Sequence, residues 1–222
     1  MDETYRFIKN SELNYLMYTL TTISIKDTKM HLKTLSFGLA VALASTVTLA
    51  APVDYKIDPT HTATVFSWNH FGFSTPSANF SDIQGVIKVD NAKPANSSVD
   101  VTIPLSSVNT NVPALDKEFQ QEAWFNAAKY PNITFKSTKV ETKDKKHFKI
   151  TGDLTVKGVT KPVVLDAVLN KQGEHPMAKV PAIGFNATTS FNRSEFGLGS
   201  YVPNVGDKIT VNITTEATAA KK

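Results

Sequence analysis

The sequence contains no cysteine among its 222 residues. A disulfide framework and a thiolate metal site are therefore excluded, and the hydrophobic core must stabilise the fold unaided. An excess of one charge is also missing, because the formal net charge is only +4 and lysines are interspersed with carboxylates outside the short run 143–146. No basic stripe with interleaved aromatic residues occurs, so nucleic-acid binding is not predicted.

Signatures of catalysis are equally scarce. No GxSxG motif occurs, which leaves no nucleophile elbow for a serine hydrolase. The histidines match no zinc signature, and segment 152–163 lacks the spacing of a phosphate-binding loop. The sequence therefore predicts no enzyme, no cofactor and no metal site. A metal-dependent enzyme that uses His61 and His70 is kept as a rival interpretation.

An apolar run covers residues 35–47 and is too short and too rich in alanine to predict a transmembrane helix. It lies within residues 30–50, which begin with the basic His31 and Lys33 and end with the small residues Thr48 and Ala50. This arrangement predicts a secretory signal peptide that is cleaved after Ala50. The protein is therefore expected to be periplasmic or secreted.

Residues 1–29 do not resemble the start of a signal peptide, because they include Asp2, Glu3, Glu12 and Asp27. Two interpretations are open. Translation starts at Met30 and the upstream extension is not native, or a long leading segment is removed together with the signal peptide. Both interpretations leave residues 51–222 as a single domain of a size common among all-β proteins.

Apolar and polar residues alternate along most of the chain after residue 53. One example is the segment 64–70, in which Thr64, Phe66, Trp68 and His70 alternate with Val65, Ser67 and Asn69. A period of two residues predicts half-buried strands. Further strands are predicted at 83–89, 99–105, 131–141, 146–157, 162–171, 180–192 and 207–217, with turn residues between them.

One segment, 111–130, departs from this alternation. Leu115, Phe119 and Ala123 follow one another at helical spacing, and Pro113 suits the first turn of a helix. We expect a helix over 113–130 that crosses over between two strands and covers the interior. The predicted elements indicate an all-β fold, either an antiparallel barrel of about eight strands or a sandwich. A barrel of this size is filled by side chains or holds one ligand, and the pattern leaves both open.

Several segments resemble the YceI-like family. They are 55–61 (YKIDPTH), Phe66 with Trp68 and 70–72 (HFG), 107–111 (SVNTN), 124–125 (WF), 130–135 (YPNITF), 152–163 (GDLTVKGVTKPV), 193–197 (RSEFG) and 205–207 (VGD). These segments occur in the family's order and span essentially all of residues 51–222. The resemblance implies an extended lipocalin-like barrel around a long apolar tunnel.

The same resemblance implies a function. Members of the family bind polyisoprenoids or similar amphiphiles, are often periplasmic, can form homodimers and have no established enzymatic activity. The expected partner is therefore a long-chain isoprenoid, such as a polyprenyl pyrophosphate or a quinone precursor. The alternative is a structural or stress-response interaction protein whose barrel is filled. In the helical segment the family often carries an Arg-Asp pair, whereas this chain has Leu115 followed by Asp116.

Aromatic residues recur along the predicted strands and helix, and they suit an apolar tunnel because they cover a large area at a modest entropic cost. Most of them would also serve as ordinary core in any barrel. The predicted tunnel residues are Phe66, Trp68, Phe71, Phe73, Phe80, Trp124, Phe125, Phe135, Phe148 and Phe196, and Phe185 and Phe191 belong to the same inventory.

A polar head group would need partners at the mouth of the tunnel. Arg193 is the only arginine after residue 50, and it either grips a phosphate through paired hydrogen bonds or forms an ion pair with a carboxylate. His61 is either a ligand contact or a hydrogen-bonded structural residue. The full set of predicted head-group residues is His61, Asn69, His70, Asn109, Arg193 and Ser194.

Overall fold

The computed structural model describes residues 51–221. The predicted signal peptide 30–50 and the upstream segment 1–29 lie outside these residues. The described elements are β1 (Val53–Ile57), η1 (Pro59–His61), β2 (Ala63–Ser67), β3 (Ser77–Phe80), β4 (Gln84–Val89), η2 (Pro94–Asn96), β5 (Ser98–Pro104), η3 (Leu105–Ser107), β6 (Val108–Asn109), α2 (Pro113–Gln120), β7 (Asn132–Thr142), β8 (His147–Val156), β9 (Val159–Glu174), β10 (Pro181–Asn192), η4 (Arg193–Phe196) and β11 (Lys208–Thr218).

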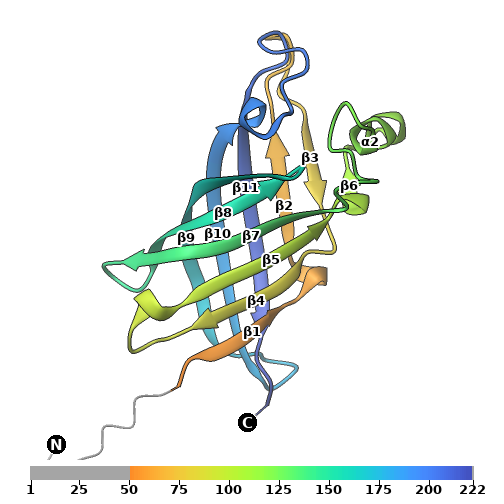
Figure 1. The fold of residues 1–222 in the computed structure, drawn as a ribbon. Helices are drawn as coiled ribbons and strands as arrows, with labels where there is room; N and C mark the ends of the chain where they lie inside the picture. The colour runs from red at the N-terminus through yellow and green to blue at the C-terminus, as the bar shows by residue number, and fades with distance from the viewer. Residues whose placement is uncertain (1–50, 222) are drawn as a thin grey trace, which may run out of the picture. The chain divides into compact units, whose positions relative to one another are not determined.

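Eight antiparallel strands close into a ring in the order β1-β4-β5-β7-β8-β9-β10-β11 (Figure 1). The closing contact pairs Lys56 of β1 with Thr218 of β11, and Ile57 with Ala217. The middle of β11 pairs instead with β2, which pairs with β3, which in turn pairs with β6. The structure confirms the predicted all-β antiparallel barrel of about eight strands. The short strands β3 and β6 were not predicted, because two to four residues display too little alternation.

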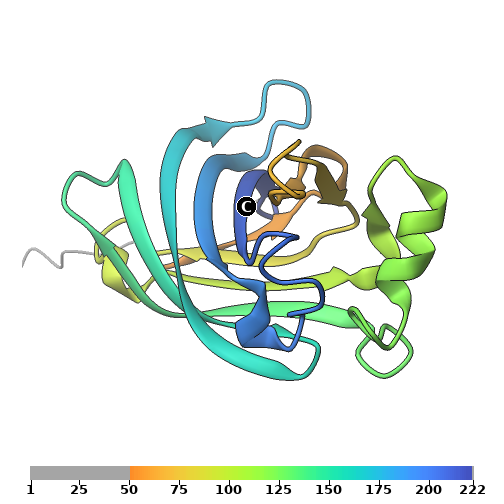
Figure 2. The same ribbon diagram turned by 90° about the horizontal axis from the view of Figure 1, so that it is seen from above.

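The crossover element between β6 and β7 is a short helix. The prediction extended the helix to residue 130, whereas α2 ends at Gln120 because Gln121 adopts an extended conformation (φ −70°, ψ 165°). The following residues form turns, in which the Phe125 amide donates to the Phe119 carbonyl at 3.1 Å and Asn126 adopts a positive φ of 52°. Seen along the barrel, α2 lies at one side of the ring of strands (Figure 2). Within residues 51–221, no helix is long and apolar enough to cross a membrane.

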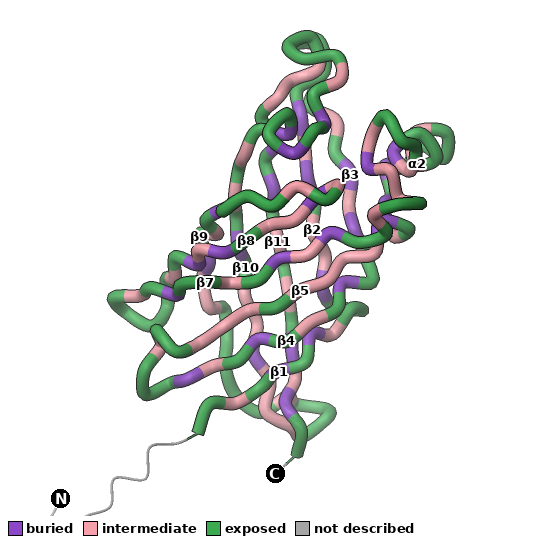
Figure 3. The backbone as a smooth tube through the Cα atoms, in the orientation of Figure 1, coloured by how far each residue is buried: buried purple, intermediate pink, exposed green. Residues whose placement is uncertain are grey.

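Burial alternates along the strands, as their side chains point by turns toward the interior and the solvent (Figure 3). β11 is a clear case, with Ile209, Val211 and Ala217 buried while Lys208 and Thr210 are exposed. The buried side chains form one large cluster that extends to α2 and a smaller cluster around Tyr55 and β1. The inward face of the barrel is thus apolar along its length, and this face forms the candidate site.

Gly152 fits a close approach within this interior. It occupies an inward position of β8 opposite Ser137 of β7, and the ring of the nearby Phe135 lies over it. A Cβ atom at this position would lie 2.4 Å from the Phe135 ring, well inside contact distance. Because Gly152 has no side chain, the Phe135 ring can pack directly against β8.

Candidate ligand-binding site

The barrel encloses an elongated cavity of about 530 Å³. Its wall is built from the alternate residues that face inward, for example Thr64, Phe66 and Trp68 on β2 and Ile209 and Val211 on β11. The volume falls within the range of about 300–1,000 Å³ that is typical of small-molecule sites. The interior of residues 51–221 is therefore hollow and is not filled by the protein's own side chains.

The cavity follows the long axis of β11. The inward residues from Ile209 to Thr215 all line it, and six residue steps of about 3.4 Å correspond to a length of roughly 20 Å. On β10 the lining continues over the same distance from Phe185 to Phe191 and then reaches Arg193. The site is thus a long channel, whose shape suits an extended chain.

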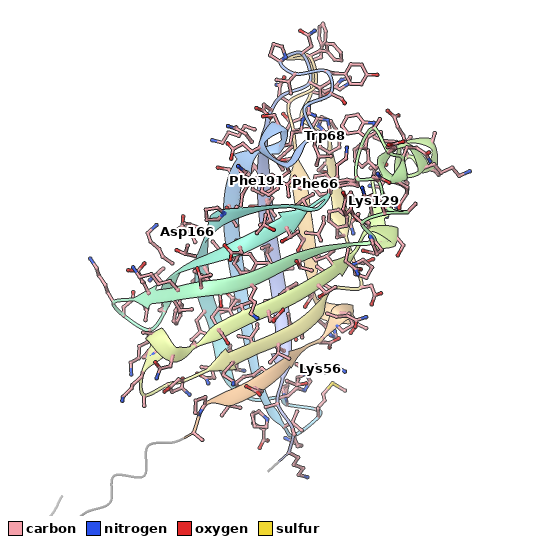
Figure 4. All side chains as sticks on the ribbon, in the orientation of Figure 1. Lys56, Phe66, Trp68, Lys129, Asp166 and Phe191 are labelled. Carbon is pink, nitrogen blue, oxygen red and sulfur yellow. The ribbon has the colours of Figure 1, made fainter. Side chains whose placement is uncertain are left out.

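One end of the channel is walled by stacked aromatic rings. The Phe66 ring lies 5.8 Å from Trp68 and 5.2 Å from Phe80, measured between centroids. Phe119 of α2 completes this group from outside the strands, 5.9 Å from Trp68. Figure 4 shows Phe66, Trp68 and Phe191 in the upper part of the barrel. Such contacts hold the rings in fixed orientations and give the channel a rigid apolar wall.

The structure places most predicted tunnel residues on the channel. Those that line it are Phe66, Trp68, Phe71, Phe80, Trp124, Phe125, Phe135, Phe185, Phe191 and Phe196.

Two predicted tunnel residues do not line the channel. Phe73 is 92% exposed, because it lies in the turn after β2 and its phase is opposite to that of Phe66 and Trp68. Phe148 has the same inward phase as Ile150 but lies nearer the turn between β7 and β8. There its ring packs edge to face against the lining residue Phe185, with 6.0 Å between ring centroids, but does not itself line the channel.

Among the predicted head-group residues, only His70 and Arg193 line the channel. His61 is exposed on η1, where its Nδ1 lies 2.8 Å from Oδ2 of Asp58. This hydrogen bond raises the pKa of His61, and hydrogen bonds from Thr60 and His61 lower the pKa of Asp58 to about 2. His61 is therefore a structural partner of Asp58 at the barrel surface and not a mouth residue.

The remaining predicted head-group residues stabilise turns. The Asn69 side chain accepts a hydrogen bond from the Gly72 amide at 2.8 Å, and that of Asn109 accepts one from the Asn111 amide at 2.8 Å. The Ser194 hydroxyl donates to the Asp207 carboxylate at 2.7 Å. The two asparagines thus satisfy local backbone amides in the manner usual for turn residues, whereas Ser194 links η4 to the Asp207 side chain.

Arg193 makes contacts that were not predicted from the sequence. Its side chain is buried, and its guanidinium donates to four backbone carbonyls, those of Leu198, Ser200, Val205 and Gly206. Within residues 51–221 it forms no ion pair with a carboxylate. Burial lowers the pKa of Arg193, although the charge of Asp207 opposes this effect. Arg193 therefore organises the loop between η4 and β11.

The guanidinium also lies over the ring of Trp124, 5.7 Å from its centroid. The Trp124 ring in turn lies 6.3 Å from the Tyr201 ring, and its Nε1 donates to Oε1 of Glu118 at 3.0 Å. All four residues line the channel. The segment after α2 and the loop after η4 thus meet at this end of the channel through Trp124.

Several polar residues that line the channel were not among the predicted site residues. Glu118 lines the channel from α2, and four threonines (Thr62, Thr64, Thr189 and Thr215) line it from β10, β11 and the β2 region. The hydroxyl oxygens of Thr62 and Thr215 lie 3.0 Å apart and form a hydrogen bond. The signal for Thr64 was present in its phase, which it shares with Phe66 and Trp68. The apolar channel therefore carries a few hydroxyl groups on its inner wall.

No group of three or more metal-ligating side chains occurs in the part of the chain that the structure describes. His61 and His70, the two residues of the metalloenzyme interpretation, have different surroundings. His61 is paired with Asp58 on the surface, whereas His70 lies at the mouth, 4.7 Å from the Phe71 ring.

An antiparallel eight-stranded barrel around one elongated apolar channel defines the lipocalin-like class of folds. The chain belongs to the YceI-like family, because residues 55–217 match the model of the YceI-like domain. Protein YceI of Escherichia coli O157:H7 is 37% identical over 174 residues, which cover 78% of this chain and 90% of that protein.

Solved structures show the same fold. The YceI protein of Campylobacter jejuni superimposes with a TM-score of 0.62 at 35% identity, over 69% of this chain and 90% of that one. A polyisoprenoid-binding domain from Saccharophagus degradans, implicated in plant cell wall breakdown, superimposes with a TM-score of 0.58 at 13% identity, over 76% of this chain and 99% of that one.

Proposed function

We propose that this protein is an exported carrier that shields a long isoprenoid-type lipid from water, and that it is not an enzyme. The observation that carries the proposal is the channel of about 530 Å³, which is lined almost entirely by apolar side chains. The Saccharophagus domain of similar fold is described as polyisoprenoid-binding, which supports the isoprenoid class for this chain. Neither a metal nor a cofactor is part of the proposal.

The length of the channel suits a chain more than a compact ligand. An apolar tail makes no hydrogen bonds, so its binding depends on the removal of its surface from water, at about 0.8 kcal/mol per CH₂ group. Loss of translational and rotational freedom costs about 4–15 kcal/mol. Roughly ten or more buried carbons are therefore needed for net affinity, and the channel, roughly 20 Å long, can accommodate such a chain.

The polar lining favours an uncharged head group. Four N–H groups of Arg193 are already bonded to backbone carbonyls, and Glu118 brings a carboxylate to the same end. No lysine of residues 51–221 lines the channel. A pyrophosphate would lie beside a carboxylate without a free cation, whereas an alcohol, phenol or quinone can bond to hydroxyls such as those of Thr64 and Thr189. Of the expected ligands, the quinone precursor is therefore preferred to the polyprenyl pyrophosphate.

Export is the second part of the proposal. It is supported by the basic start, apolar run and small terminal residues of 30–50, which have the pattern of a signal peptide. N-terminal sequencing of the protein from its own host tests it, and a mature N-terminus near Met1 would exclude export. A homodimer, as in other members of the family, stays a prediction that analytical ultracentrifugation can test.

Mass spectrometry of lipid extracted from protein purified out of its own host tests the carrier function. Val163 and Val164 offer a matched pair of variants, since Val163 lines the channel while its neighbour Val164 points outward and is 43% exposed. Val163→Asp places an unpaired carboxylate in the channel and is expected to remove the lipid, whereas Val164→Asp should retain it. Circular dichroism establishes that both variants are folded.

Two outcomes would contradict this proposal. Absence of any lipid from the unmodified protein would favour the rival structural or stress-response role. Equal lipid content in the two folded variants would show that the lipid lies elsewhere. Loading of delipidated protein with a polyprenol and with the polyprenyl pyrophosphate of the same length tests the head group, and tighter binding of the pyrophosphate would refute an uncharged ligand.

A further inference from the structure

Two loops at the mouth of the channel expose a group of large apolar side chains. The turn between β2 and β3 contributes Phe71 and Phe73, which are 50% and 92% exposed. The loop between η4 and β11 contributes Tyr201 and Val202, which are 67% and 37% exposed. We call these four residues the aromatic tip, and the two loops that carry it lie together at the upper end of the barrel in Figure 1.

Backbone hydrogen bonds tie the two loops of the aromatic tip to each other. The Phe71 amide donates to the Asn204 carbonyl at 2.9 Å, and the Gly206 amide donates to the Asn69 carbonyl at 2.8 Å. The guanidinium of Arg193 fixes the second loop from below through its four carbonyl contacts. The exposed rings are therefore carried by a connected, hydrogen-bonded structure.

The backbone at the aromatic tip is unfavourable for the residues that occupy it. Phe71 has φ 54° and Tyr201 has φ 63°, both in the left-handed region. Bulky side chains rarely adopt this conformation, and Gly or Asn would adopt it more readily. Each ring lines the channel with one part, but the backbone does not favour an aromatic residue here, and contact with another surface explains the part of each ring that is exposed.

The two segments that carry the aromatic tip contain no formally charged residue. Residues 67–81 and 196–206 contain no Asp, Glu, Lys or Arg, although 20% of the whole chain is charged. Exposed aromatic residues without neighbouring charges are suited to the interfacial layer of a bilayer, where Trp and Tyr are enriched and charged groups are costly. A partner of complementary charge, by contrast, would find no ionic group to pair with.

The aromatic tip is continuous with the channel. Phe71 and Tyr201 are exposed to solvent and also line the cavity, so each ring belongs to both surfaces. We propose that the aromatic tip docks the mouth of the barrel onto the interfacial layer of a phospholipid bilayer. A lipid tail can then pass between membrane and channel with little exposure to water.

Flotation with vesicles of phosphatidylcholine, which have no net charge, tests this docking. Phe73 is the residue to change, because it is the most exposed member of the tip and does not line the channel. Phe73→Ser is expected to lower the partition coefficient about tenfold, the lower end expected for loss of one buried aromatic side chain. Met177→Ser is the matched control, since Met177 is 87% exposed on the turn between β9 and β10. It should leave partitioning unchanged.

A second variant reports insertion directly. Phe73→Trp keeps an aromatic side chain, and the emission that it adds to that of Trp68 and Trp124, taken as the difference from the unmodified protein, should shift to shorter wavelength when vesicles are added. Binding should also persist at high salt, because the aromatic tip has no charge to screen. All variants carry the same N-terminal segment, so any contribution of residues 1–50 to vesicle binding cancels in the comparison.

Equal partitioning of Phe73→Ser and the unmodified protein would overturn the proposal. Binding that requires anionic lipid and disappears at high salt would also overturn it. If the unmodified protein does not bind vesicles and substitution of Phe73 changes its oligomeric state, the aromatic tip contacts a second copy of the chain instead. The lipid content of the same preparations separates this proposal from the carrier function. If the unmodified protein contains bound lipid but does not bind vesicles, only the docking proposal is refuted. If it binds vesicles but contains no bound lipid, only the carrier function is refuted.

Discussion

Replacement of Arg193 by Met distinguishes a structural arginine from one that grips a ligand. The substitution keeps much of the apolar stem but removes all donors to the carbonyls of the loop between η4 and β11. A hydrogen bond from a charged donor contributes about 1.5–3 kcal/mol, and four such bonds would together exceed the 4–5 kcal/mol that already marks an exceptional single substitution. The loop lies at the barrel end, where its carbonyls can be hydrated after local opening.

We therefore expect Arg193→Met to lower the free energy of unfolding by about 2–4 kcal/mol, measured by urea denaturation. Arg193→Lys keeps the charge without the planar fork and should cost about 1–2 kcal/mol. Lys208→Met removes an exposed charge nearby and should change stability by less than about 0.5 kcal/mol. In Arg193→Met, amide hydrogen exchange should show the loss of protection first at the amides of Leu198 and Val205. A variant of unchanged stability that loses its lipid would refute this structural role and favour ligand contact.

Three further predictions follow from the geometry. Trp68→Asp should abolish lipid retention in a folded protein, because Trp68 lines the channel and an unpaired carboxylate there is strongly disfavoured; a full lipid complement by mass spectrometry would contradict its placement. Asp58→Asn should return the pKa of His61 toward its ordinary value of 6.5, measured by NMR. Since Asp58 raises that pKa and its own pKa is lowered to about 2, the pair's stabilising effect is fully present between about pH 3.8 and pH 6.5. It is lost as the pH rises through the raised pKa of His61 or falls through the pKa of Asp58, and an unshifted titration of His61 would exclude the contact. Gly152→Val should destabilise the barrel by about 1–3 kcal/mol in urea, because it displaces the Phe135 ring, and unchanged stability would show that the ring moves freely.

The alternation of residues carried most of the information about the fold. Thr64, Phe66, Trp68 and His70 were predicted to share one face, and all four line the channel. Phe73 was predicted from its aromatic character and not from its phase, which is opposite to that of Phe66, and it lies exposed in the turn after β2. Helical spacing identified the position of α2 but not its end, which is set by the extended backbone of Gln121.

The environment of Arg193 could not be predicted in the same way. Its partners are backbone carbonyls of residues 198–206, and every residue type carries such a carbonyl. Residue identity therefore gives no sign that four of them converge on one guanidinium. The inward threonines differ, because their phase along β2, β10 and β11 marks them once the strands are known. Thr64 was predicted to face inward with Phe66 and Trp68, but no threonine was predicted as a site residue, because the predicted tunnel residues were all aromatic.

The seam between β1 and β11 has a consequence for how the molecule is assembled. β11 holds β10 along one edge, and along its other edge it holds both β1 and β2, which precede it by about 150 residues in the chain. Contacts of such long sequence separation form slowly. Until β11 is in place, β1 and β10 both present unpaired edges that can recruit other chains. The chain therefore needs protection from aggregation until β11, its last long strand, has paired with both edges.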